Sequence, residues 1–174
     1  TSEEPTDSDR ESTPELPGNL KAVYGQTLAD ITLPEGFSWK DNKASVGKAG
    51  ENTFTVIYKA SDAADPEEHE VTVTVEKATN TWTKPLAIIG WTYGKTKNDP
   101  SATAAHGTVT YAYSSSENGT YSADAPTTAG TWYVKAEIEE TDNYTGLESK
   151  PVSFKIKPKD GTKLTIPTIT STTD

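Results

Sequence analysis

The sequence predicts an all-β protein of two tandem β-sandwich modules with disordered ends. Three observations support this prediction. The 174-residue chain holds 29 threonines, and threonine is β-branched and favours pleated, half-exposed surfaces. Eleven prolines and twelve glycines punctuate it with turn signals. Several segments alternate apolar and polar residues with a period of two, and their order repeats once along the chain.

The first module is predicted over residues 18–78. Its clearest strand is His69–Glu76, in which Val71, Val73 and Val75 face one way and threonines face the other. Such alternation indicates a strand with one buried face, and a second sheet is the natural cover for that face. Similar alternation appears at Ile31, Leu33, Phe37 and Trp39, and again in Asn52–Lys59.

The second module is predicted over residues 79–158. In Thr131–Ile138 we expect Trp132, Val134, Ala136 and Ile138 to point inward. The other expected strands are Leu86–Ile89, Thr108–Ser114 and Pro151–Lys157.

Both modules share a layout. A Tyr-Gly turn comes near the start of each, and an Ala-Gly turn (Ala49-Gly50, Ala129-Gly130) leads into a strand. The spacing of these features is about 70–80 residues, the size of one small β-sandwich. We expect glycine at the Ala-Gly turn because a tight entry into a strand often needs a positive φ. The modules meet near Lys77–Thr81, a linker short enough to couple them.

The two ends have a different texture. Residues 1–17 hold six acids and one arginine, and three prolines interrupt them, so we predict a disordered acidic linker. Residues 159–174 are a linker or the start of a further module. The net charge of −10 argues against a nucleic-acid partner. No apolar run approaches about 18 residues, so no membrane span is expected.

The residues also resemble a known family. The segments that carry this resemblance are Val23–Leu28, Leu33–Asp41 and Val46–Phe54 in the first module, and Trp91–Gly94, Gly107–Ser114, Ala129–Ala136 and Thr141–Gly146 in the second. They are similar to immunoglobulin-like repeats of large secreted and cell-wall-anchored proteins of Gram-positive bacteria. The resemblance implies immunoglobulin-like sandwiches in a modular stalk, on the bacterial cell surface or secreted. It implies no catalytic residue.

We therefore expect a non-catalytic, monomeric spacer segment that presents other domains away from the cell envelope. Its partners are then the neighbouring modules of the same polypeptide. Two alternatives remain open: an adhesion module that binds host glycan or protein, and an accessory region of a larger secreted enzyme.

The candidate ligand surface consists of Trp82, Trp91 and Tyr93, which cluster near the start of the second module. Exposed aromatic rings of β-sandwich modules stack on sugar rings. The favoured alternative is that Trp91 packs in the core and Trp82 seals the junction, because large aromatic side chains dominate core energetics.

The sequence offers few residues for metal binding, catalysis or covalent cross-links. The absence of cysteine excludes disulfides, zinc-thiolate sites and iron–sulfur clusters, and we expect no metal or cofactor. His69 and His106 are interpreted as surface residues, since no serine occupies a G-x-S-x-G turn. The acidic stretch Asp62–Glu68 is a weak calcium candidate that lacks EF-hand spacing. The last strands carry no Asn or Asp with which to form an isopeptide bond.

Overall fold

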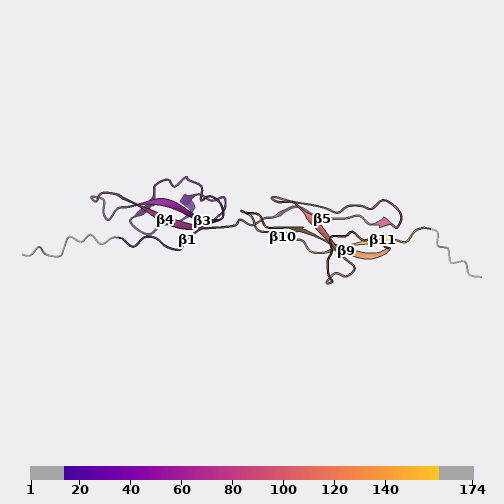
Figure 1. The fold of residues 1–174 in the computed structure, drawn as a ribbon. Coiled ribbons are helices and arrows are strands. Elements are labelled where there is room, and N and C mark those ends of the chain that lie inside the picture. Colours follow the sequence, from indigo (N-terminus) through magenta and orange to yellow (C-terminus); the bar gives the residue numbers. More distant parts are fainter. Residues whose placement is uncertain (1–13, 161–174) are drawn as a thin grey trace, which may run out of the picture. The chain divides into compact units, whose positions relative to one another are not determined.

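The computed structural model describes residues 14–160, and this part of the chain is all-β, as predicted. The chain divides into two compact units (Figure 1). Unit 1 comprises Thr1–Ala78 and Asp142–Tyr144, and unit 2 comprises Thr79–Thr141 and Thr145–Asp174. The predicted disorder of residues 1–17 and the tail at 159–174 lie mostly outside the described residues. No helix in the described part is long and apolar enough to cross a bilayer.

Unit 1 is built on one four-stranded sheet with the order β1-β4-β3-β2. These strands are β1 (Leu20–Val23), β2 (Phe37–Trp39), β3 (Gly50–Tyr58) and β4 (Glu67–Glu76). The β3–β4 and β2–β3 pairs are antiparallel, whereas β1 runs parallel to β4. The first strand of the unit therefore pairs with its last.

The buried face of this sheet carries the valines predicted from the alternation. Val71, Val73 and Val75 are at most 5% exposed. Their cover comes from irregular chain rather than from a second sheet, since Leu28, Ile31 and Val46 complete the same core cluster. Leu28 belongs to the short 3-10 helix η1 (Leu28–Asp30). The core of unit 1 thus combines a regular layer with an irregular one.

The described part of unit 2 holds seven strands in two sheets. Strands β10-β9-β11-β6 form the larger sheet, in which β8 also pairs with β9, and β5 pairs only with β7. The strands are β5 (Trp82–Ala87), β6 (Trp91–Thr92), β7 (Ser101–Ala104), β8 (Thr110–Ser114), β9 (Gly130–Ile138), β10 (Leu147–Glu148) and β11 (Val152–Lys157). The short β6 runs parallel to β11.

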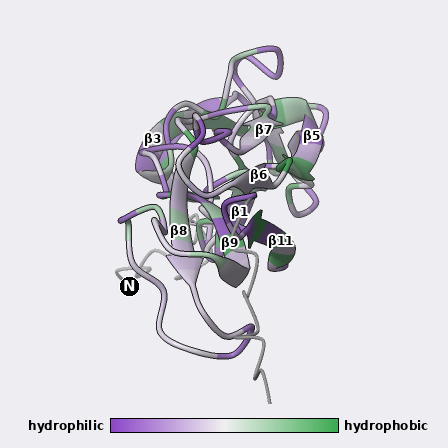
Figure 2. Cartoon of the chain, turned by 90° about the vertical axis from the view of Figure 1, so that its right-hand side faces the viewer, coloured by the Kyte–Doolittle hydropathy of each residue, from purple (hydrophilic) through white to green (hydrophobic). Residues whose placement is uncertain are grey.

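The core of unit 2 follows the predicted alternation along β9. Val134, Ala136 and Ile138 are at most 4% exposed, whereas Trp132 is half-buried and packs against the cluster of Tyr113, Val134, Phe154 and Ile156. Figure 2 shows patches of hydrophobic colour on strands such as β5 and β11, with much of the connecting chain hydrophilic.

The Ala-Gly turns play the same part in both units. Gly50 opens β3 with φ of 120°, and Gly130 opens β9 with φ of 150°. Both values lie where an L side chain is strained, which confirms the reason given for glycine at this turn. Each glycine pairs with the last strand of its unit, Gly50 with Val75 and Gly130 with Ile156. The repeat seen in the sequence is therefore a repeat of strand pairing.

Candidate functional site

The three candidate aromatic residues lie in different surroundings within unit 2. Trp91, in β6, stacks on Phe154 with ring centroids 5.4 Å apart and planes inclined by 24°. Its indole is thereby part of the core packing of the unit. Tyr93 is 49% exposed, and its backbone N–H donates to the carbonyl oxygen of Lys157 at 2.8 Å.

Trp82 lines an open groove of about 360 Å³ that Trp91 and Tyr93 do not line. Strand β5 supplies Trp82, Pro85 and Leu86, and Val152 faces them from the start of β11. Aromatic and aliphatic side chains thus form an apolar surface between two stretches of chain that are about 65 residues apart. This composition suits stacking on a ring or on another apolar group.

Two of the three polar residues that line the groove, Glu148 and Ser149, form hydrogen bonds within the protein, and the third is the exposed Lys150. Glu148 accepts a hydrogen bond from Lys135 Nζ at 2.9 Å, and this bond raises the pKa of Lys135. The same ammonium group lies 4.5 Å from the centre of the Tyr121 ring, within cation–π range. Ser149 Oγ accepts from the N–H of Ala136 at 2.9 Å. These contacts hold Glu148 and Ser149 in place at the edge of the groove.

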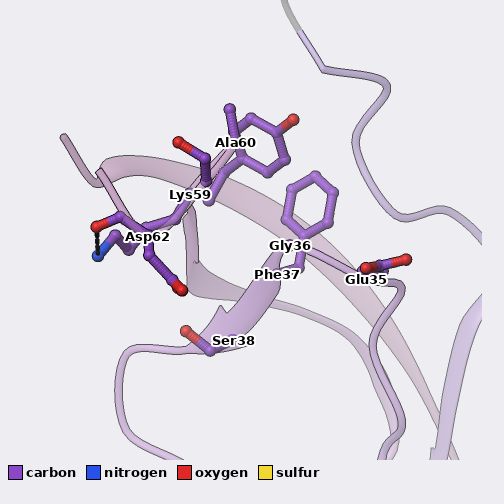
Figure 3. A pocket seen from close by; sticks show the side chains of 9 residues that line it. Glu35, Gly36, Phe37, Ser38, Lys59, Ala60 and Asp62 are labelled. Carbon is purple, nitrogen blue, oxygen red and sulfur yellow. Dashed lines mark hydrogen bonds between the residues drawn. The ribbon is translucent and has the colours of Figure 1, made fainter. Parts of the chain in front are cut away.

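A larger, more polar hollow of about 610 Å³ lies in unit 1 (Figure 3). Residues 35–38, around the start of β2, and residues 58–62, at the end of β3, line it. Phe37 and Tyr58 place their rings 4.8 Å apart. Lys59 Nζ bonds the backbone oxygen of Asp62 at 3.4 Å, the dashed line of Figure 3. Among the nine lining residues the only side-chain charges are those of Glu35, Lys59 and Asp62.

Two glutamates at the end of the acidic stretch contact basic side chains. Glu68 contacts Lys40 at 2.9 Å, and Glu67 lies 3.3 Å from His69 Nε2. Within residues 14–160, no group of three or more His, Asp or Glu side chains is close enough to hold a metal ion. The calcium hypothesis at Asp62–Glu68 therefore gains no geometric support.

Two further pKa values are displaced, each for a local reason. Burial raises the pKa of the Tyr113 hydroxyl. A hydrogen bond from Lys97 to Asp99 at 3.0 Å raises the pKa of Lys97. Neither residue lines the hollow or the groove just described.

Sequence reasoning missed several asparagines that organise the backbone. Asn80 is 2% exposed; its amide nitrogen donates to the carbonyl of His106 at 2.7 Å, and its oxygen accepts the His106 N–H at 3.1 Å. Asn52 bonds the carbonyls of Val46 and Lys48, each at 2.8 Å. The side-chain amides of Asn52 and Asn80 thus bond backbone groups that a neighbouring strand would otherwise bond. No periodicity in the sequence marks these two residues.

No protein-family model matches the chain, and no curated protein matches it. Among solved structures, an endo-fucoidan hydrolase from glycoside hydrolase family 107 aligns with 16% identity and a TM-score of 0.29. The alignment covers 77% of this chain and 24% of the hydrolase chain. A likeness of this size carries no argument about function.

Proposed function

We propose that the chain is a non-catalytic spacer segment of a secreted or surface-anchored bacterial protein, made of two tandem immunoglobulin-like modules. It presents other domains away from the cell envelope and carries tension between them. The resemblance to cell-wall-anchored repeats supports this proposal, as does the repeated strand pairing of the two units.

The observation that carries the proposal is the parallel pairing, in each unit, of an early strand with the last strand. In unit 1, β1 pairs in parallel with β4, and in unit 2, β6 pairs in parallel with β11. The start of the earlier strand and the end of the later strand then lie at opposite ends of the ladder. Tension along the polypeptide loads all hydrogen bonds of such a ladder together, in shear, instead of one after another.

The rest of each unit suits the same task. The valine-rich core of unit 1 and the aromatic core of unit 2 provide the stability that resists unfolding. The packing uses no cysteine, so it holds under any redox condition.

Stretching single molecules of the whole chain between handles at its two ends tests the proposal. A spacer keeps its folded length as tension rises and then lengthens in discrete steps, since forced unfolding is governed by the unfolding rate of each unit. Gradual lengthening from the lowest tension, as for an unstructured chain, would refute the spacer role.

A second candidate function rests on the groove at Trp82, whose apolar lining suits a sugar ring. On this alternative, a glycan array probed with the whole chain gives reproducible binding that Trp82→Ala abolishes. Tyr93→Ala is the matched control, because Tyr93 is exposed but does not line the groove. Equal signals from the two variants would dismiss the groove as a glycan site.

A further inference from the structure

We propose that the two units yield to tension in a fixed order, with unit 2 first and unit 1 second, because the parallel ladders that join an early strand to the last strand differ in length. This inference rests on the spacer function proposed above and adds to it a graded response. Unit 2 acts as the extensible element, and unit 1 holds its length until the tension is higher.

The ladder of unit 1 is the longer one. Four consecutive residues of β1 pair with β4, from Leu20 opposite Val73 to Val23 opposite Glu76. The backbone N–H of Tyr24 extends the ladder by donating to the carbonyl of Glu76 at 2.9 Å. Leu20 and Ala22, on the inner side of β1, are at most 8% exposed, so the core also anchors the strand.

The ladder of unit 2 has half as many pairs. Trp91 lies opposite Ile156 and Thr92 opposite Lys157, and the N–H of Tyr93 adds a bond to the carbonyl of Lys157 at 2.8 Å. Both residues of β6 are used in these two pairs. On the N-terminal side of β6, Gly90 approaches the backbone of Lys155 too closely to leave room for a side chain.

The difference in length sets the order. In a sheared ladder the bonds share the load, so the ladder with fewer pairs carries more tension per bond. Tension speeds the unfolding of unit 2 more strongly, and forced unfolding follows the unfolding rate. The second ladder of unit 2, β5 with β7, adds little resistance because its register shifts twice along its length.

The order is read from step sizes when single molecules of the whole chain are stretched. When unit 2 unfolds, the chain from Trp82 to Lys157, which includes Asp142–Tyr144 of unit 1, releases roughly 76 residues, or about 260 Å at ~3.4 Å per residue. From Leu20 to Glu76, unit 1 releases roughly 57 residues, or about 190 Å on the same scale. We expect the long step to come first, at the lower tension, in most molecules.

Engineered disulfides provide the matched test, because the chain contains no cysteine of its own. Thr92→Cys with Lys157→Cys bridges the ladder of unit 2, and Lys21→Cys with Thr74→Cys bridges that of unit 1. Neighbouring strands lie about 4.8 Å apart, which is within disulfide range. Reduction of the same molecules provides the unbridged control for each variant.

We expect the oxidised unit 2 bridge to shorten the first, long step by about 220 Å, the chain enclosed between the bridged positions. The oxidised unit 1 bridge removes most of the later, short step and leaves the first unchanged. A short step that comes first, or two steps in random order, would overturn the proposed order and leave the spacer function standing. Gradual lengthening without steps would overturn both.

Discussion

The close approach of Gly90 to β11 makes the sharpest stability prediction. In Gly90→Ala, the new methyl carbon overlaps the carbonyl oxygen of Lys155 and lies 3.2 and 3.3 Å from its carbonyl carbon and nitrogen. All three are backbone atoms, so no side chain can rotate away. The overlap is relieved only if β6 moves off β11.

The cost follows from what that movement breaks. The two residue pairs of β6 and the bond from Tyr93 N–H to Lys157 are at stake. Hydrogen bonds contribute about 1 kcal/mol each, and overpacking typically costs about 1–3 kcal/mol. We therefore expect unit 2 to lose about 2–4 kcal/mol of unfolding free energy. For a unit of this size that is a fall of roughly 10 °C or more in Tm.

Thermal and denaturant unfolding of the whole chain measures the loss, and hydrogen exchange assigns it to a unit. Gly18→Ala is the control, since an added carbon there meets nothing within 4 Å and φ is not positive. The reasoning fails if Gly90→Ala unfolds within about 0.5 kcal/mol of the unaltered chain. It also fails if amide protection is lost in β3 and β4 rather than in β9 and β11.

Three further predictions concern single residues. Asn80→Ala removes both hydrogen bonds that the buried side chain of Asn80 makes with the backbone of His106. We expect denaturant unfolding to show a loss of about 1–3 kcal/mol in unit 2, and a change below about 0.5 kcal/mol would contradict this. Asn143→Ala removes the acceptor of the Ala49 N–H, a 3.0 Å bond within unit 1. We expect hydrogen exchange to show weaker amide protection in unit 1. Weaker protection confined to unit 2 would contradict the placing of residues 142–144 in unit 1. Burial raises the pKa of Tyr113 above its ordinary value of 10.0, so the folded state favours the neutral phenol. The stability that is present below pH 10 is therefore lost as the pH rises through the raised pKa. We expect the unfolding free energy of Tyr113→Phe to fall less steeply at alkaline pH, and a fall equal to that of the unaltered chain would exclude this cause.

The sequence predicts best those elements whose own residues alternate. Val71, Val73 and Val75 fall on the buried face of β4 because a strand exposes every second residue to the core. The glycines of the two Ala-Gly turns were recognisable from their neighbours alone. By contrast, the cover of unit 1 by Leu28, Ile31 and Val46 follows no period, since irregular chain places each residue separately.

The candidate site shows the same limit. Trp82, Trp91 and Tyr93 are close in sequence, and proximity alone suggested a common surface. The structure separates them because Trp91 turns onto Phe154, whereas Trp82 lies with Val152 in the groove. Contacts between residues about 65 positions apart create that groove, and no local pattern encodes them.

The unequal ladders have a common origin in how each unit begins. In unit 1 the first strand, β1, pairs with the last strand along all four of its residues. In unit 2 the corresponding stretch of chain is divided, so that β5 joins the small sheet and only the two residues of β6 join the large one. Gly90 stands between these two strands, where its missing side chain lets the backbone pass against Lys155. The two units thus share the same turns and the same strand pairing but differ in the length of the parallel ladder. The ladder of unit 2 is shorter because the chain first joins the small sheet as β5 and only then pairs with β11 as β6.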